Sequence, residues 1–224
     1  MKYFLISAVC ILASWLLVNL VVMWQADKNF AYGKNLDGVA HYTDAYAYLT
    51  RAVESNPDEP TFRDELSYNQ AVIASALIHT ATASAQQLAS QAIENSNIVV
   101  ESSPNAMPFW KTRTKVFYQL ATIDSKYYLE ALAAIKKASE LAPTDAKVAY
   151  NLAILYGQTG QIKNAIATLE ETIKIKADYR DAYYALGLYY KEIDNIPMAR
   201  ATMEKILQKI GPDAETQKWL EENK

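Results

Sequence analysis

Apolar residues follow two different patterns along the chain. Between Tyr3 and Trp24 they form a continuous run that carries no charge. Beyond this run, alanines and larger apolar residues recur at helical spacing, and short polar stretches with proline or glycine separate them. The first pattern predicts a helix long enough to cross a hydrocarbon layer of about 30 Å. The second predicts a series of short helices that pack through one face.

The helices after position 25 share a repeating spacing. Five alanines mark it, and the last two intervals between them are equal while the first two are longer: Ala45, Ala92, Ala131, Ala165 and Ala199. A second series follows the first at a constant offset: Pro57, Pro104, Pro143, Ala177 and Gly211. A third series keeps the same intervals: Ala52, Val99, Ala138, Thr172 and Ile206. Three series in step indicate an internal repeat.

The last two repeats, which are equal in length, carry a motif. The later one reads Tyr183-x2-Leu186-Gly187-x2-Tyr190, then Ala199-x3-Met203. The earlier one reads Ala149-x2-Leu152-Ala153-x2-Tyr156, then Ala165-x3-Leu169. This pattern resembles the tetratricopeptide repeat (TPR). The resemblance covers about 190 of the 224 residues, and it implies helix pairs whose small residues lie where the two helices nearly touch.

The predicted fold is all-α: a right-handed α-solenoid of about five helix–turn–helix units, preceded by one transmembrane helix. Residues 1–25 form the anchor and residues 26–213 the solenoid, with units 26–59, 60–106, 107–145, 146–179 and 180–213. The second unit is the longest, so longer helices are expected around a turn near 81–83. Residues 214–224 form a polar capping helix, whose Trp219 and Leu220 face the last unit. No proline lies between Trp24 and Leu36, so the membrane helix should continue unbroken into the first repeat.

The N-terminal run has a competing interpretation as a cleaved signal peptide. The apolar region of such a peptide spans about 7–15 residues, which is shorter than this run. Residues 3–24 are therefore expected to hold the protein in the membrane. Lys2 precedes the run while Lys28 and Lys34 follow it, so the positive-inside rule is nearly balanced. We expect the N-terminus in the cytoplasm and the TPR domain outside it.

Composition argues against several classes of function. The formal net charge is −3, whereas a nucleic-acid-binding protein would show a basic surface. One cysteine, two histidines and six glycines supply neither a cysteine-rich metal site nor a glycine-rich phosphate loop. We therefore expect no enzyme activity, no cofactor, no metal and no nucleic-acid partner.

The TPR resemblance implies that the first helix of each pair lines a concave face where peptides bind. The residues predicted on this face in the last three units are Lys111, Lys115, Tyr118, Tyr150, Asn151, Ile154, Tyr184, Leu188 and Lys191. They suggest an aromatic and mildly basic groove for an acidic peptide. The alternative is that they are solvated helix positions without a ligand. The leading prediction is a membrane-anchored TPR scaffold that mediates protein–protein interactions at the cell envelope. A homo-oligomer is also possible.

A second resemblance gives the alternative function. Residues 113–124 (RTKVFYQLATID) together with residues 141–190 resemble the C-terminal repeat tail of bacterial O-antigen ligase or polymerase-like membrane proteins. Members of that group carry many membrane spans before the tail, whereas this chain has one candidate. The alternative is therefore an accessory or detached tail of a glycan ligase or polymerase system, and no catalytic residue is transferred from the resemblance.

Overall fold

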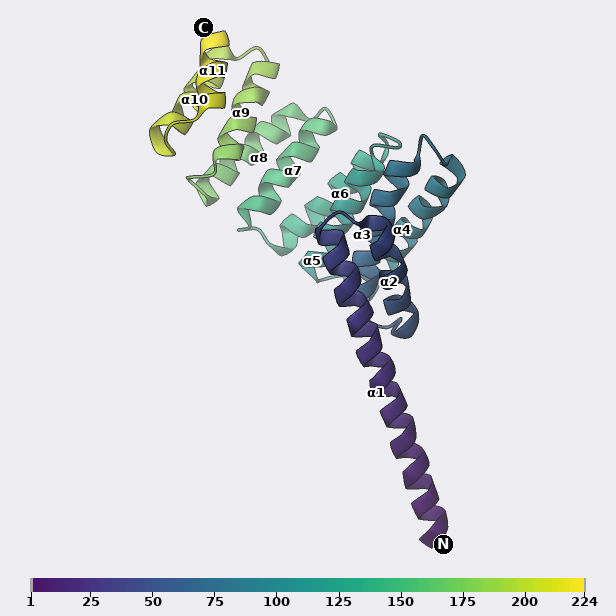
Figure 1. Ribbon diagram of the computed structural model, residues 1–224. Helices are drawn as coiled ribbons and strands as arrows, with labels where there is room; N and C mark the ends of the chain where they lie inside the picture. Colours follow the sequence, from purple (N-terminus) through teal and green to yellow (C-terminus); the bar gives the residue numbers. More distant parts are fainter. Residues whose placement is uncertain (1, 224) are drawn as a thin grey trace. The chain divides into compact units, whose positions relative to one another are not determined.

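The computed structural model describes residues 2–223, which form eleven helices and no strand (Figure 1). The helices are α1(Lys2–Gly38), α2(Tyr42–Ser55), α3(Pro60–Leu77), α4(Thr82–Ser102), α5(Met107–Leu120), α6(Tyr127–Leu141), α7(Ala146–Gln158), α8(Ile162–Ile175), α9(Arg180–Glu192), α10(Ile196–Lys209) and α11(Ala214–Glu222). Consecutive helices alternate with short turns, as the repeat spacing predicts. The boundaries of the five units stay a prediction.

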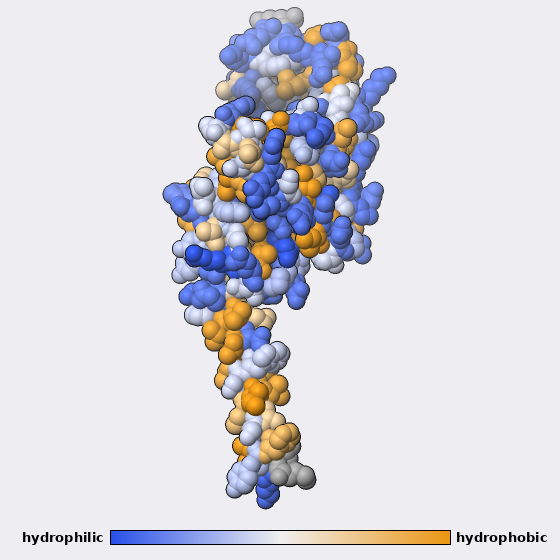
Figure 2. Space-filling view, turned by 90° about the vertical axis from the view of Figure 1, so that its right-hand side faces the viewer, coloured by the Kyte–Doolittle hydropathy of each residue, from blue (hydrophilic) through white to orange (hydrophobic). Residues whose placement is uncertain are grey.

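Helix α1 is a single uninterrupted helix of 37 residues. The expected continuity past Trp24 is therefore confirmed, and the helix ends at Gly38, just beyond Leu36. The described apolar side chains between Tyr3 and Trp24 are exposed, and Figure 2 shows hydrophobic surface along this helix. Among residues 2–223, α1 is the one helix whose length and mean hydropathy, 2.5 over its most apolar window, suit a membrane crossing.

The chain forms two compact units. Unit 1 contains the chain up to Pro104 together with Lys115–Asp124, and unit 2 contains Asn105–Thr114 and Ser125 onwards. Helix α5 contributes its first half to unit 2 and its second half to unit 1.

The apolar core of unit 1 joins α1, α2 and the start of α3. Ala45, Leu49 and Ala52 are fully buried there, and the rings of Phe30 and Phe62 stack with centroids 4.7 Å apart. Helices α3 and α4, with 18 and 21 residues, form the long hairpin expected from the second repeat. Their turn at 78–81 comes slightly before the predicted position.

Unit 2 contains the more regular pairs α7/α8 and α9/α10. Its core is built around Tyr183, Leu169 and Met203, which are almost completely buried. Trp219 of α11 is buried in this same cluster and Leu220 packs against it, as the sequence predicts for the capping helix. Burial of these apolar side chains is the main force that holds the short helices, since isolated helices of 13 or 14 residues are marginal in water.

In three turns between paired helices, one residue adopts the same left-handed backbone conformation. Gly160 after α7 has a φ of 74°, and Asp194 after α9 has a φ of 58°. Ala40 after α1 has a φ of 62°. Each residue lies five positions before the repeat alanine (Ala165, Ala199 and Ala45). The left-handed residue reverses the chain so that the second helix can fold back on the first.

Helix starts are set by side-chain caps. The carboxylate of Asp145 accepts hydrogen bonds from the Lys147 and Val148 amides at the start of α7. At the start of α10, Asn195 accepts a bond from the Met198 amide. Such caps satisfy amides that have no partner inside the helix, so these polar residues fix where the repeat helices begin.

Candidate peptide-binding pocket between α7 and α9

The first helices of the last two pairs enclose a pocket of about 330 Å³. Its lining residues come from α7 and α9: Tyr150, Ile154, Arg180, Asp181, Tyr184, Ala185, Leu188, Tyr189 and Glu192. Four residues predicted for the partner groove, Tyr150, Ile154, Tyr184 and Leu188, are therefore brought together. The volume lies at the lower end of the range for ligand pockets, about 300–1,000 Å³.

Helical periodicity explains why these residues meet. Tyr150 and Ile154 are four positions apart on α7, and Tyr184 and Leu188 are four positions apart on α9, so each pair occupies one helix face. Ala185 lies between the α9 residues in sequence and its small side chain leaves space in the pocket. The pocket thus follows from large side chains around a small one on two neighbouring helices.

Close approach of α7 and α9 depends on Gly157. A Cβ atom at this position would overlap the Tyr189 ring of α9. Glycine therefore lets the Tyr189 side chain lie directly on α7, where it forms one wall of the pocket. The Tyr150 ring is also held from outside, because its centroid lies 5.3 Å from that of Tyr179.

Arg180 anchors the other end of the pocket. Its Nε donates to Asp213 Oδ2 at 3.0 Å, and its Nη2 donates to Asp213 Oδ1 at 3.1 Å and to Glu215 at 2.6 Å. Its guanidinium lies 4.6 Å from the centroid of the Tyr184 ring. The arginine holds the pKa of Asp213 well below its usual range through these hydrogen bonds. Its charge is therefore used to fix α11 and the Tyr184 ring.

The net charge of the pocket lining is acidic, since Asp181 and Glu192 outnumber Arg180. Asp181 lies 3.5 Å from Arg180 and keeps an exposed carboxylate. Glu192 is exposed and has no ion pair within the described part of the chain. The lysines predicted to make the groove basic do not line this pocket. The α7–α9 pocket is lined by three tyrosines and by no lysine.

The remaining predicted groove residues have other neighbours. Lys111 Nζ lies 3.8 Å from Asp145, and Lys191 Nζ lies 5.7 Å from the Trp219 ring. Asn151 follows Tyr150 on α7 and is half-buried. Lys115 and Tyr118 belong to unit 1, where Lys115 Nζ lies 5.7 Å from the Tyr68 ring.

Sequence reasoning missed the link between Arg180 and Asp213. Asp213 stands directly before the capping helix, at the position where a capping carboxylate is common. The sequence therefore indicates that Asp213 caps a helix. It does not indicate that Asp213 also pairs with an arginine 33 residues earlier.

The described residues contain no group of three or more histidine, cysteine, aspartate or glutamate side chains arranged to hold a metal ion. His41 Nδ1 lies 3.4 Å from Asp44 Oδ2 on the exposed first turn of α2. This pair is a contact at a helix start, and neither side chain faces a pocket described above.

Comparison with known proteins identifies the repeat. Residues 123–189 match the family model described as tetratricopeptide repeat. The BBSome complex member BBS4 of Mus musculus is 27% identical over 123 residues, which are 54% of this chain and 23% of that protein. Its Drosophila melanogaster homolog is 22% identical over 107 residues, 48% of this chain and 21% of that protein. The chain therefore spans less than a quarter of these relatives' length.

Solved structures share the fold. The TPR protein TTC0263 of Thermus thermophilus aligns with a TM-score of 0.60 at 19% identity, over 88% of this chain and 98% of that one. MamA from Desulfovibrio magneticus RS-1 aligns with a TM-score of 0.64 at 16% identity, over 82% and 94%. YrrB, described as a TPR protein with an unusual peptide-binding site, aligns with a TM-score of 0.61 at 15% identity, over 87% and 90%.

None of the proteins named above is a glycan ligase, so the resemblance to O-antigen ligase tails stays a prediction. The matched segment, 123–189, contains α6, α7, α8 and most of α9, and thus both helices that form the pocket. Residues 123–189 therefore match the TPR family model, and the chain shares the helical fold of solved TPR proteins.

Proposed function

We propose that this protein is a membrane-anchored TPR scaffold of the cell envelope that binds a protein or peptide partner through the first helices of its repeats. The observation that carries the proposal is the aromatic pocket between α7 and α9, within the segment that matches the TPR family. TPR proteins bind peptide or protein partners, and YrrB is described as having a peptide-binding site.

The chemistry of the pocket favours a particular kind of peptide. Tyr150, Ile154 and Leu188 offer an apolar contact for one aliphatic or aromatic side chain. Asp181 and Glu192 lie at the same pocket and add attraction for a lysine or arginine beside that side chain. The proposed ligand is therefore an apolar residue next to a basic one, instead of the acidic peptide expected from the sequence.

The membrane anchor is supported by α1. The apolar side chains that the structure describes between residues 3 and 24 are exposed, which is unfavourable in water. In the proposed topology residues 3–24 cross the bilayer, the N-terminus is cytoplasmic and the repeats lie outside the cytoplasm. Anchoring raises the effective concentration of the repeats for partners in the same membrane.

The pocket is tested with the full chain in lipid nanodiscs. Peptides are selected by phage display and their affinities are measured by fluorescence anisotropy. Leu188→Glu should weaken the selected peptides by tenfold or more, because it places a charge in the apolar part of the pocket. Leu129→Glu is the matched control, since Leu129 is an exposed leucine of α6 that lines none of the described pockets. Equal effects of the two variants would contradict the pocket assignment.

Topology is tested with the single cysteine. In a Cys10→Ser background, a cysteine is introduced at exposed Ser90, and intact bacterial cells that express the chain are treated with a membrane-impermeant maleimide. Labelling of intact cells supports repeats outside the cytoplasm, whereas labelling only after lysis contradicts it. The mass of the purified chain distinguishes a retained anchor from a cleaved signal peptide.

A further inference from the structure

A second pocket lies on the other side of α9. It has a volume of about 440 Å³ and is lined by residues of α8, α9 and α10: Glu170, Ile173, Lys174, Tyr183, Leu186, Tyr190, Met198, Thr202, Lys205 and Lys209. The α9 residues of this pocket, Tyr183, Leu186 and Tyr190, differ from those that line the α7–α9 pocket. Helix α9 therefore lies between two pockets. It lines one together with α7, the first helix of the preceding pair, and the other together with α8 and α10, the second helices of the two pairs.

Positive charge dominates the lining of this α8–α10 pocket. Three lysines line it, Lys174, Lys205 and Lys209, against one glutamate, Glu170. Glu170 is already bound, because its Oε1 accepts a hydrogen bond from the Tyr190 hydroxyl at 2.6 Å. Lys174 is paired with Glu171 at 2.6 Å. This leaves Lys205 and Lys209 as the cations available to a ligand.

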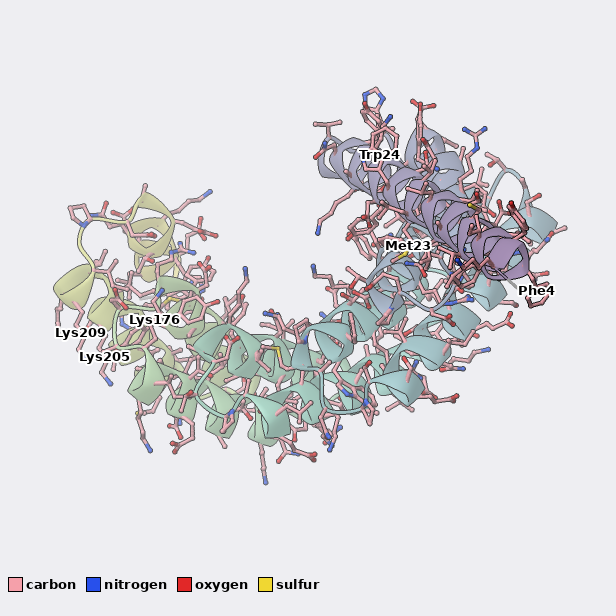
Figure 3. The ribbon with its side chains drawn as sticks, turned by 90° about the horizontal axis from the view of Figure 1, so that it is seen from below. Phe4, Met23, Trp24, Lys176, Lys205 and Lys209 are labelled. Carbon is pink, nitrogen blue, oxygen red and sulfur yellow. The ribbon has the colours of Figure 1, made fainter. Side chains whose placement is uncertain are left out.

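The two available lysines differ in how they are held. Lys209 Nζ donates to the Tyr183 hydroxyl at 3.3 Å and lies 5.8 Å from the centroid of that ring. The Tyr183 hydroxyl in turn donates to the Ala177 carbonyl at 3.2 Å. Lys205 is exposed and has no ion pair within residues 2–223. Figure 3 shows both side chains at the edge of the yellow-green helices. One cation is thus held in position by a tyrosine, and the other extends into water.

The rest of the pocket is apolar. Ile173 of α8, Leu186 of α9 and Met198 of α10 supply aliphatic surface between the charged groups, and the Met198 side chain is 42% exposed. Methionine adapts to irregular ligands because its side chain is flexible and polarizable. A simple anion would use only the lysines, whereas the apolar surface favours a ligand with an apolar group beside the negative charge.

We infer that the α8–α10 pocket is a second docking site, which binds an acidic peptide segment containing one aromatic or large aliphatic side chain. The apolar side chain lies against Met198 and Ile173, and flanking carboxylates face Lys205 and Lys209. The site lies on a different face of α9 from the α7–α9 pocket and takes ligands of the opposite charge. The inference does not depend on the proposed function, since it uses none of the residues of that pocket.

The test uses the full chain in phosphatidylcholine nanodiscs and a fluorescein-labelled peptide of sequence GEEFEEG, with binding followed by fluorescence anisotropy. Lys205→Glu combined with Lys209→Glu should weaken binding by tenfold or more, and the effect should shrink at high salt. The matched control reverses two exposed lysines outside the pocket, Lys147→Glu with Lys163→Glu. This control should change the affinity by less than twofold.

A double-mutant cycle tests the apolar contact. Met198→Gln should weaken GEEFEEG severalfold and should not affect GEEAEEG, in which alanine replaces phenylalanine. The inference is overturned if the control lysines matter as much as Lys205 and Lys209, because the attraction is then long-range. It is also overturned if GEEFEEG and GEEAEEG bind equally and inorganic phosphate displaces both, because the site then binds simple anions. Absence of binding to the unmodified chain at millimolar peptide overturns it as well.

Discussion

The two compact units bury different kinds of side chain. Unit 1 buries amides and a carboxylate: the Asn69 side-chain amide donates to Asp37 Oδ1 at 2.7 Å and to the Tyr42 carbonyl at 2.8 Å. Asn95 donates to Gln70 at 2.9 Å across the α3–α4 hairpin. These bonds join separate helices, so unit 1 is held partly by directional contacts.

Unit 2 buries polar side chains of another type. Thr172 and Thr202 are buried, but their hydroxyls donate to carbonyls four residues earlier in the same helix, at 2.7 and 2.8 Å. The core contacts between its helices are made by alanines and large apolar residues around Tyr183. Polar bonds between its helices, such as those from Arg180 to Asp213 and from Tyr190 to Glu170, lie in the partly exposed shell. The core of unit 2 therefore depends on shape and burial, whereas that of unit 1 depends in addition on buried hydrogen-bond partners and on protonation.

The largest effect is expected from the core of unit 2. Tyr183→Ala should destabilise unit 2 by about 3–5 kcal/mol, because it removes a buried aromatic side chain and leaves a cavity. Tyr184→Ala is the neighbouring control and should cost clearly less, since Tyr184 is only half-buried. Hydrogen exchange of the full chain in detergent, followed by mass spectrometry, should show a loss of amide protection in α7–α10. An equal loss of protection throughout unit 1 would contradict the conclusion that the two units have separate cores.

A matched glycine pair compares the two units directly. Gly33 and Gly187 occupy the same repeat position, at equal distances before the repeat alanines Ala45 and Ala199. A Cβ at Gly33 would lie 2.7 Å from Leu49 Cγ and 3.2 Å from the Leu49 backbone nitrogen, whereas at Gly187 the nearest atom is the flexible end of Met203. Gly33→Ala should destabilise by about 1–3 kcal/mol.

Gly187→Ala should leave the stability nearly unchanged. The flexible Met203 side chain can move away from the added Cβ, and alanine favours a helix by about 1 kcal/mol over glycine. Thermal melts of the full chain in detergent measure both variants. A larger loss of stability for Gly187→Ala than for Gly33→Ala would contradict the expectation that Met203 yields more easily than Leu49.

The next prediction concerns pH in unit 1. Burial raises the pKa of Asp37 to about 6, Glu65 adds to the rise and the hydrogen bond from Asn69 opposes it. The folded state therefore binds this proton more tightly than the unfolded chain. The resulting stabilisation is full below about pH 4, and it is lost as the pH rises through about 6.

Asp37→Asn should remove this pH dependence, because an amide cannot ionise and its oxygen can still accept the bond from Asn69. The measurement is hydrogen exchange of residues 26–38 between pH 4.5 and 7.5, corrected for intrinsic exchange rates. Asp58→Asn changes an exposed carboxylate and should leave the profile unchanged. Identical profiles for the unmodified chain and Asp37→Asn would show that Asp37 has an ordinary pKa.

The smallest effect is expected at a turn. Ala40 has a φ of 62°, which is unfavourable for any residue with a Cβ. A Cβ-free residue fits this conformation, so Ala40→Gly should stabilise unit 1 by about 0.5–1 kcal/mol. Gly160→Ala is the reciprocal change in unit 2 and should destabilise by a similar amount, because Gly160 has a φ of 74°. Urea unfolding of the full chain in detergent gives both values.

Sequence predicted those parts of the fold that depend on spacing. Alanines such as Ala165 and Ala199 were informative because a position where two helices touch admits only a small side chain, and both are fully buried. Continuity of α1 was predictable because no proline interrupts it. Tyr150, Ile154, Tyr184 and Leu188 were placed together because helical periodicity alone assigns a face.

Features that depend on long-range partners were not predictable in this way. Asp37 and Asn69 are 32 positions apart, and each reads in sequence as a surface residue. The basic partner groove stays a prediction, and the neighbours of its lysines were not predictable for a related reason: Lys111 and Lys191 reach an aspartate and a tryptophan that spacing does not reveal. The left-handed turn at Ala40 was missed because alanine gives no signal for it.

The unbroken course of α1 has a mechanical consequence for an anchored scaffold. At about 1.5 Å per residue the 37 residues of α1 extend roughly 55 Å as one rod. If residues 3–24 lie in the bilayer as proposed, there is no hinge between the lipid and the first repeat, and Leu49 of α2 is locked against Gly33 of the rod. If α1 tilts in a thinner membrane, α2 then tilts with it. Inserting one residue after Trp24 would rotate the first repeat by about 100° around the axis of α1. The number of residues in α1 therefore also sets the direction in which the first repeat faces.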